Sequence, residues 1–275
     1  MYFPSGHYYS AIVEVDEVRQ RQDEIWLQDI PLTIPGIKLN LADQMQLISE
    51  FSKTYNEIPF PAHQSERFLY YFENPFYSYS DGIFLYSFIR HFNPLRIIEI
   101  GSGFSSALML DTLELLGRIQ TRLSFIEPFP ERLYSLIKVK DIQQVSIYEK
   151  KLQQVNISFF TQLEENDILF VDSTHVTKTG SDVNYLLFEI LPSLKKGVLI
   201  HFHDIFYPFE YPKEWVFEGR SWNEDYILRS FLMYNDHFTI IMFPDFLHKV
   251  QHECLESMPA CFKNHGGSIW LRKTH

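Results

Sequence analysis

The segment RIIEIGSGFSSALMLD, which runs from Arg96 to Asp111, decides the fold of this chain. Its β-prone apolar residues lead to the acid Glu99, a Gly-Ser-Gly turn follows, and an apolar helical pattern comes next. This order predicts a strand, a tight turn and a helix. Such a turn lets a ligand approach the backbone closely, and the start of the helix offers free N–H groups to it. We therefore expect a small molecule to bind at this turn.

Strand and helix patterns alternate along the chain after Leu95. The segments predicted as strands are RIIEI, LSFIE, VSIYE, DILFVD and GVLIHFHD, and helical patterns separate most of them. Repeated βα units predict a parallel, doubly wound α/β sheet that binds ligands beyond the carboxyl ends of its strands. The last two predicted strands, FTIIMF and GGSIWLR, have no long helix predicted between them, so we expect an antiparallel pair joined by a loop.

The first part of the chain has a different pattern, in which aromatic-rich pieces alternate with polar stretches. We predict an N-terminal helical and aromatic extension or cap over residues 1–75, followed by one α/β domain over residues 76–275. Packing alone also explains the aromatic excess, because Phe and Tyr clusters are common in cores. Helical spacing in the extension predicts one broad apolar face, made of Leu41, Met45, Leu47, Ile48 and Phe51.

Composition narrows the classes of partner. The chain has 275 residues, 45% of them hydrophobic, and a net charge of −11. This charge repels polyphosphates, which argues against nucleic acid or an anionic membrane as the main partner and favours a small-molecule ligand. We find no signal-peptide pattern and no apolar run of about 18 residues, so we expect a soluble cytoplasmic protein with reduced Cys254 and Cys261. The sequence leaves a homo-oligomer open.

Two acids at predicted strand ends indicate which ligand the turn holds. Dinucleotide-binding turns read G-x-G-x-x-G, whereas here the third position is Ser106 and Glu99 precedes the first glycine by two residues. A carboxylate there disfavours a pyrophosphate and suits an ammonium group. Glu127, at the end of the next strand, suits two ribose hydroxyls. Both features fit S-adenosylmethionine, although Glu99 capping a helix and Glu127 being merely solvated stay open as alternatives.

At this point the chain resembles a known family. The segments IIEIGSGFSS and FIEP are similar to the glycine motif and ribose acid of class I S-adenosylmethionine-dependent methyltransferases. The stretches YSDGIFLYSFIRHFNPLRIIEIGSGFSS, DILFVDSTHVTKTGSDVNYLLFEILPSLKKGVLIHFHDIFYPFEYPKEW, NEDYILRSFL and GGSIWLR resemble the bacterial branch known as methyltransferase domain 24, from about Asn74 to Arg272. The resemblance implies a Rossmann-like, seven-stranded sheet whose last strand is antiparallel.

The resemblance also implies a set of residues that bind the cofactor. Its motif implies that four residues surround the methionine part and the ribose of the cofactor: Glu99, Gly101, Ser102 and Gly103. It places Glu127 on the ribose hydroxyls and Asp172 near the transferable methyl group. Further candidates for the cofactor side are Tyr77, Tyr79 and Ser80, and for the adenine Gln153 or Gln154.

The acceptor side is predicted from VDSTHVTK and HFHD, which follow or close two neighbouring strands. The candidate catalytic residues are Asp172, His175 and His203. A hydroxyl acceptor needs a general base or a metal ion that lowers its pKa. Three alternatives stay open. In the first, Asp172, His203 and Asp204 hold Mg²⁺, Mn²⁺ or Fe²⁺, and His175 is the base. In the second, His or Asp catalyses the reaction without a metal, and in the third the histidines are purely structural. Related metal-dependent O-methyltransferases carry an acid where His203 stands, which disfavours Mg²⁺.

Downstream of HFHD lies an aromatic segment, YPFEYPKEWVFEGRSWNEDY. It fits either a lid or acceptor wall or a packed connector, and its notable residues are Tyr207, Tyr211, Trp215, Arg220 and Trp222. Asn223 or Glu224, near the start of the following helix, is expected to touch the acceptor. We expect methyl transfer to an oxygen, less readily a nitrogen, of a sugar or secondary metabolite. The competing functions are an NAD-dependent oxidoreductase, disfavoured by Glu99 and Ser106, and a catalytically silent binding module.

Overall fold

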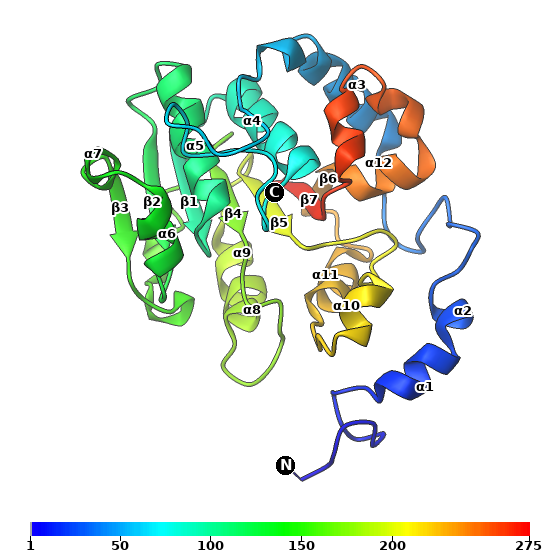
Figure 1. Cartoon of the computed structure of the whole chain (residues 1–275). Coiled ribbons are helices and arrows are strands. Elements are labelled where there is room, and N and C mark those ends of the chain that lie inside the picture. Colours follow the sequence, from blue (N-terminus) through cyan, green and yellow to red (C-terminus); the bar gives the residue numbers. More distant parts are fainter. Residues whose placement is uncertain (1) are drawn as a thin grey trace.

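The computed structural model describes residues 2–275, which contain one seven-stranded mixed sheet (Figure 1). The strands are β1 (Arg96–Ile100), β2 (Arg122–Ile126), β3 (Val145–Tyr148), β4 (Ile168–Val171), β5 (Leu199–His203), β6 (Phe238–Met242) and β7 (Ser268–Lys273). Their order across the sheet is β3-β2-β1-β4-β5-β7-β6. Only β7 runs antiparallel to its neighbours. The predicted Rossmann-like α/β sheet with an antiparallel last strand is therefore confirmed.

Helices join the strands and flank the sheet. The α-helices are α1 (Val15–Gln20), α2 (Gln22–Ile25), α3 (Leu41–Ser52), α4 (Tyr79–Phe92), α5 (Phe104–Leu115), α6 (Glu131–Leu136), α7 (Val139–Ile142), α8 (Asp182–Tyr185), α9 (Leu191–Ser193), α10 (Lys213–Phe217), α11 (Glu224–Leu232) and α12 (Pro244–Val250). The short helices are η1 (Tyr55–Glu57), η2 (Leu152–Gln154), η3 (Ile157–Phe159), η4 (Leu186–Ile190, a π-turn that joins α8 to α9), η5 (His252–Leu255) and η6 (Pro259–Lys263).

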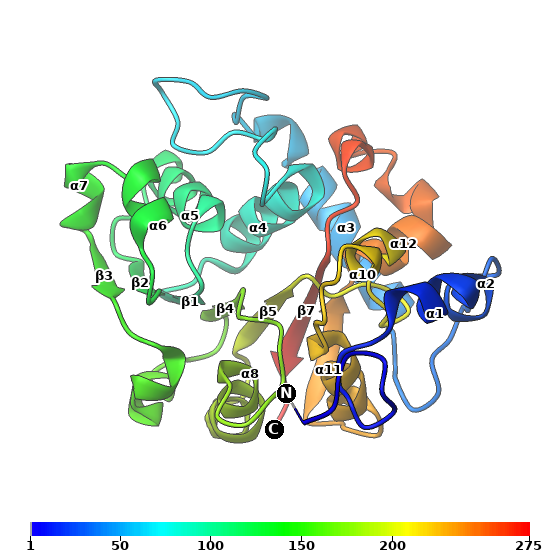
Figure 2. The ribbon, with the colours of Figure 1, turned by 60° about the horizontal axis from the view of Figure 1, so that its bottom comes forward.

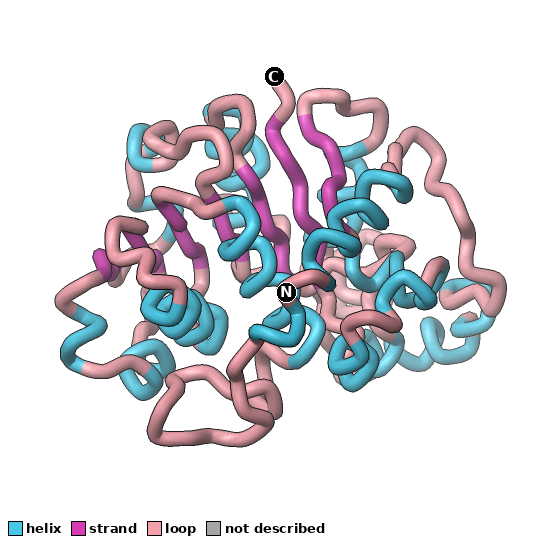
Figure 3. Tube along the Cα trace, turned by 90° about the horizontal axis from the view of Figure 1, so that it is seen from above, coloured by secondary structure: helices cyan, strands magenta, loops and turns pink. Residues whose placement is uncertain are grey.

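The sheet is the middle of three layers, with helices on both faces (Figures 2 and 3). Helices α4, α5 and α6 lie on one face, and α8 and α11 lie on the other (Figure 2). Phe88 of α4 stacks on Trp270 of β7, with ring centroids 3.7 Å apart. Both rings are buried, and such contact between a helix and the sheet excludes water from the core. The layers leave the carboxyl ends of the parallel strands at one common edge.

The predicted loop between the last two strands was wrong. β6 and β7 do pair antiparallel, but α12, η5 and η6 lie between them. Helix α12 starts with Pro244, whose missing N–H costs nothing in a first helical turn. Phe246 and Leu247 of this helix are buried. A helix this short gives too few apolar repeats to stand out in the sequence.

The predicted N-terminal extension packs onto the sheet domain in the structure. Gln44 of α3 donates to the Leu39 carbonyl and accepts from the backbone N–H of Phe243, which follows β6. Gln44 is therefore buried, and Met45, predicted on the apolar face, is 40% exposed. Trp26 Nε1 donates to the Tyr211 carbonyl at 2.8 Å. The boundary between residues 75 and 76 stays a prediction. Within residues 2–275, no helix has both the length and the apolar character that a membrane span requires.

Candidate functional site

The glycine turn brings the ends of β1 and β4 together. Gly101 has φ +77°, and a Cβ atom at this position would lie 1.8 Å from the carbonyl oxygen of Asp172. The Asp172 N–H donates to the Ile100 carbonyl at 2.8 Å, so the two chain segments are also hydrogen-bonded. No side chain fits this close approach, and L residues avoid the left-handed conformation. The turn therefore requires glycine for two independent reasons.

A cleft of about 430 Å³ lies beyond the carboxyl ends of β1, β2 and β4. The polar residues around it include Glu127, Gln153, Asp172, Thr174 and Asp182. A cleft of this size is in the range that binds small molecules. It lies at the edge of the sheet where a doubly wound fold places its ligand.

Glu127 lies at this cleft with a half-buried side chain. One carboxylate oxygen accepts from the Ser102 N–H at 3.0 Å and the other from the Phe129 N–H at 2.8 Å. Each oxygen keeps a further lone pair, which suits ligand hydroxyls. Of the two predicted adenine residues, Gln153 lines the cleft, whereas the side chain of Gln154 accepts from the backbone of Lys151.

Glu99 does not face the cleft. Its side chain is fully buried, and its two carboxylate oxygens accept from the hydroxyls of Ser105 and Ser106 in the first turn of α5. Ser106 also accepts from the Gly103 N–H at 3.0 Å. The serine that replaces the third glycine of a dinucleotide motif thus joins β1 to α5. Glu99 therefore binds the first turn of α5 through serine side chains, whereas the N-cap residue of that helix is Gly103. Its burial in these contacts disfavours the predicted binding of an ammonium group.

Glu99 gives the fold a pH-dependent stability. Burial raises its pKa to about 8, although hydrogen bonds from serine hydroxyls oppose this shift. Between about pH 4.5 and 8 the unfolded chain releases this proton and the folded chain keeps it, so the free energy of unfolding decreases as the pH rises. This decrease amounts to up to about 1.4 kcal/mol per pH unit, and we expect Glu99→Gln to remove it. Urea unfolding of both proteins at pH 5.5, 7 and 8.5 measures it, and parallel pH curves would contradict it.

Tyr79, predicted at the cofactor, lies away from the cleft. Its ring stacks on Phe72, and its hydroxyl bonds to Glu73 and Lys263. Tyr79 begins α4 and faces the N-terminal segment, which sequence spacing does not reveal. Tyr77 lies nearer the site: its ring centroid is 5.1 Å from that of His203, and its buried hydroxyl has no hydrogen-bond partner within residues 2–275.

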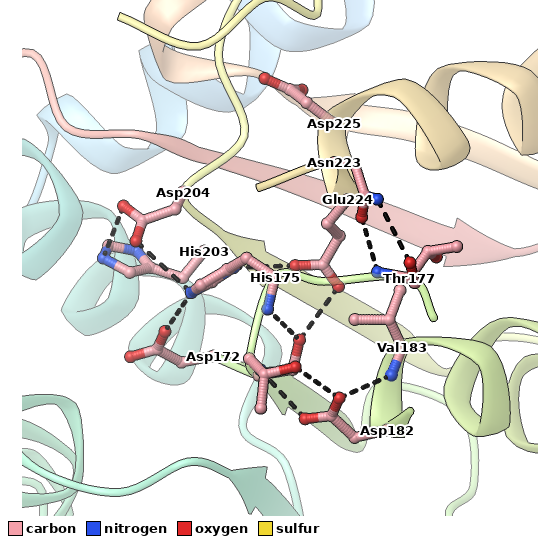
Figure 4. Close-up of polar contacts among 12 residues, drawn as sticks. Asp172, His175, Thr177, Asp182, Val183, His203, Asp204, Asn223, Glu224 and Asp225 are labelled. Atoms are coloured by element: carbon pink, nitrogen blue, oxygen red, sulfur yellow. Dashed lines mark hydrogen bonds and ion pairs between the residues drawn. The ribbon is translucent and has the colours of Figure 1, made fainter. Parts of the chain in front are cut away.

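Two carboxylates and an imidazole meet next to the cleft (Figure 4). His175 Nε2 lies 3.2 Å from an oxygen of Asp172 and 3.5 Å from an oxygen of Asp204. One ligand atom from each of the three residues lies within 4.8 Å of the others. The predicted metal trio of Asp172, His203 and Asp204 is therefore replaced by Asp172, His175 and Asp204 as the set that the geometry brings together.

His203 lies beside this cluster rather than in it. Its Nε2 is 3.5 Å from the other oxygen of Asp204. As the last residue of β5, it points to the same face of the sheet as His201, where it packs near Tyr77. His201 is fully buried and stacks on Phe170 at 4.0 Å, so it belongs to the core. Strand alternation thus places both histidines of HFHD on one face of the sheet, where His203 contacts the cluster through Asp204 alone, and the histidine of the preceding loop joins it.

The loop after β4 turns His175 into the cluster. His175 has φ +58°, an unusual conformation for a residue with a side chain. Its carbonyl accepts from the N–H groups of Asn223 and Glu224, at the start of α11. Its Nδ1 lies 2.8 Å from a carboxylate oxygen of Glu224. The sequence predicted contact between Glu224 and the acceptor, and it missed the pairing with a histidine 49 residues away.

Comparison with known proteins identifies the family. The model of the methyltransferase domain family matches residues 98–205, which run from within β1 to just beyond β5 and include Asp172 and Asp204. An uncharacterized protein of Archaeoglobus fulgidus is 32% identical over 169 residues, which are 60% of this chain and 76% of that relative. The chain belongs to this methyltransferase family. Membership favours S-adenosylmethionine over NAD as the cofactor, in agreement with the resemblance found in the sequence.

Two solved structures of methyltransferases are similar at low identity. The S-adenosylhomocysteine-bound methyltransferase PaMTH1 of Podospora anserina is 15% identical, with a TM-score of 0.47, over 94% of this chain and 97% of that one. The O-methyltransferase TomG of Streptomyces achromogenes, involved in tomaymycin synthesis and solved with S-adenosylmethionine, is 14% identical, with a TM-score of 0.44, over 94% of this chain and 96% of that one. The assignment to the methyltransferase family depends on the family model and the sequence relative.

In this methyltransferase, three carboxylates surround His175. Burial alone would lower its pKa, but hydrogen bonds to Asp172 and Glu224 and the charge of Asp204 outweigh this effect and raise the pKa well above its ordinary value. The imidazole is therefore in its positively charged form at neutral pH, with a proton on each nitrogen, unless another cation replaces one of these protons. A protonated ring does not accept a further proton, which conflicts with the predicted role of His175 as a free general base.

Part of the predicted aromatic wall reaches the methyltransferase cluster. The ring of Trp222 lies 4.4 Å from that of His175, and Trp215 packs edge-on against Trp222. Arg220 stacks over the Trp215 ring at 4.3 Å. Tyr207 instead packs in the core, where its hydroxyl bonds to a carbonyl of the N-terminal segment. Within the predicted aromatic wall, the Trp222 ring thus lies directly against the cluster.

Proposed function

We propose that this methyltransferase transfers a methyl group from S-adenosylmethionine to an oxygen of a small-molecule acceptor. One observation carries the proposal: Asp172 lines the cleft and also belongs to the cluster with His175 and Asp204. A molecule in the cleft and an acceptor hydroxyl at the cluster would therefore both lie next to Asp172, and so close to each other. Methyl transfer requires this proximity and alignment.

The cleft supplies contacts that suit the cofactor. Glu127 offers carboxylate lone pairs to ribose hydroxyls, and Gln153 offers an amide near the adenine. Gly101 lines the cleft and allows the close approach of β1 to Asp172. The bound cofactor supplies an electrophilic methyl group on a sulfonium. Glu99 would act indirectly, by holding the start of α5.

The cluster also fits a divalent ion. Two carboxylates and an imidazole nitrogen suit Mn²⁺ or Fe²⁺ better than Mg²⁺, which prefers oxygen ligands alone. Asp172, His175 Nε2 and Asp204 would hold the ion, and Glu224 on His175 Nδ1 completes the hydrogen-bonded arrangement usual for such ligands. When bound, the ion would act as a Lewis acid that lowers the pKa of the acceptor hydroxyl. Without an ion, the carboxylates of the cluster would receive the proton.

The acceptor is proposed from the groups around the cluster. A hydroxyl needs help to lose its proton at neutral pH, whereas a neutral amine attacks without it, so the cluster favours oxygen over nitrogen. Trp222 offers a flat face to a sugar or an aromatic metabolite. A cytoplasmic location, a homo-oligomer and the absence of nucleic-acid or membrane partners stay predictions.

Binding and transfer experiments test the proposal. We expect chelator-treated protein to bind S-adenosylhomocysteine but not NAD⁺ in isothermal titration. We expect Mn²⁺ to give a further heat that His175→Ala abolishes and His203→Ala reduces less. Incubation with [methyl-¹³C]S-adenosylmethionine and a mixture of phenols, sugars and amines should yield O–CH₃ signals. No binding of the homocysteine nucleoside would overturn the proposal, and N–CH₃ products alone would overturn the choice of oxygen.

A further inference from the structure

Glu224 is a buried acid at the edge of the cluster. Its side chain has no exposed surface, and it makes two hydrogen bonds, both to the loop after β4. One oxygen accepts from the Ser173 hydroxyl at 3.1 Å. The other lies 2.8 Å from His175 Nδ1, and Figure 4 shows both of these residues. Ser173 lines the cleft, but Glu224 itself and His175 do not. Glu224 is therefore placed to act on His175 rather than on a bound molecule.

We propose that Glu224 is a positioning residue that holds the Nδ1 proton of His175 and thereby directs Nε2 toward Asp172 and Asp204. The inference deepens the proposed function and rests on it, because it assigns the residue that orients one member of the cluster. Imidazole rings that bind a metal or exchange a proton commonly donate their second N–H to a carboxylate. The role of Glu224 is thus the same with or without a metal ion.

The pairing satisfies both buried groups. A carboxylate without a partner is costly to bury, and His175, only 4% exposed, supplies the opposite charge or a strong donor. Glu224 is also the first residue of α11, where the partial positive charge of the helix start favours an acid. The imidazole, the Ser173 hydroxyl and the helix start therefore compensate together for the burial of this acid.

The backbone fixes the loop independently of this pair. The His175 carbonyl accepts from the N–H groups of Asn223 at 3.0 Å and Glu224 at 3.1 Å, which supports its left-handed conformation. The Asn223 side chain accepts from the Thr177 N–H at 2.6 Å and donates to the Thr177 carbonyl at 3.2 Å. The start of α11 therefore holds the loop through Asn223 and the imidazole through Glu224, so the two roles can be separated by mutation.

Three variants separate these roles. Glu224→Gln keeps both hydrogen bonds, because its amide oxygen accepts from His175 and its NH₂ group can donate to Ser173, but it loses the charge. Glu224→Leu removes both bonds at similar volume. Asn223→Ala, the matched control, removes the side-chain contacts with Thr177 and leaves the carboxylate in place.

The first readout is the ring proton of His175 in protein labelled with ¹⁵N-histidine, assigned with His175→Gln. We expect an exchange-protected Nδ1 proton in wild type, Glu224→Gln and Asn223→Ala, and its loss in Glu224→Leu. The second readout is Mn²⁺ affinity by electron paramagnetic resonance. We expect a decrease of about 10-fold in Glu224→Gln, up to about 100-fold in Glu224→Leu and less than about 3-fold in Asn223→Ala. Affinity for S-adenosylhomocysteine should change less than about 2-fold in all three variants.

Several outcomes would overturn the inference. A protected Nδ1 proton and unchanged Mn²⁺ affinity in Glu224→Leu would show that Glu224 does not orient the ring. Equal losses in Glu224→Leu and Asn223→Ala would assign the effect to docking of α11. Wild-type protein that binds no Mn²⁺ would overturn the metal-assisted form of the proposed function, and the ring proton would still decide on Glu224. Absence of nucleoside binding would overturn the proposed function alone.

Discussion

Replacing Asp204 with Asn is expected to reduce methyl transfer by about 10³-fold, the middle of the range for removing an acid-base group. Asp204 contributes one carboxylate to the cluster and lies beside His175 and His203. Its φ is +56°, a conformation that Asn tolerates well, so the substitution removes charge without straining the turn. It also lies outside the residues that line the cleft proposed for the cofactor. Affinity for S-adenosylhomocysteine should therefore stay within about 2-fold.

Initial rates with labelled S-adenosylmethionine and the best acceptor, together with titration of the nucleoside, measure both effects. Asp236→Asn is the matched control, because this exposed aspartate precedes β6 at the opposite edge of the sheet and loses the same charge. Its rate should equal that of the wild type. A variant at position 204 with full activity would remove the cluster from the mechanism. A wild-type protein with no activity toward any acceptor, but normal nucleoside binding, would favour the silent binding module.

Replacing Gly101 with Ala is expected to abolish most cofactor binding and to destabilise the fold. The added Cβ would meet the Asp172 carbonyl oxygen at 1.8 Å, so the ends of β1 and β4 must separate. The left-handed backbone adds about 1–2 kcal/mol of strain. Because both strand ends line the cleft, we expect affinity for S-adenosylhomocysteine to fall by at least about 30-fold, which corresponds to about 2 kcal/mol.

Gly117→Ala provides the control for backbone strain alone. Gly117 also has a positive φ, of +64°, but apart from its chain neighbours no atom of residues 2–275 lies within 4 Å of its added Cβ. We expect its melting temperature to fall by about 2–8 °C, the Gly101→Ala value to fall by about 10 °C or more, and nucleoside affinity to change only in Gly101→Ala. Equal effects in the two variants would show that the close approach at Asp172 is unimportant. Failure of Gly101→Ala to fold would agree with the larger destabilisation.

The fold followed from local patterns, and the site followed only in part. Alternation of strands and helices predicted the sheet, and the acids at strand ends located Glu127 and Asp172 at the cleft. The same reasoning assigned Glu99 to the ligand, but the hydroxyls of two serines of α5 donate hydrogen bonds to its carboxylate. A strand end specifies an edge of the sheet, whereas the direction of one side chain there depends on the packing of the next helix.

The sequence by itself determined the doubly wound sheet and its glycine turn, and it predicted a nucleoside cofactor there, because strand period, turn residues and helix starts are local properties. Only the tertiary structure decided which histidine joins the two aspartates. Alternation along β5 turns His203 toward Tyr77, while a left-handed residue and the start of α11 bring His175 into the cluster. That choice depends on Glu224, 49 residues away, and contacts across such separations leave no periodic signal in the chain.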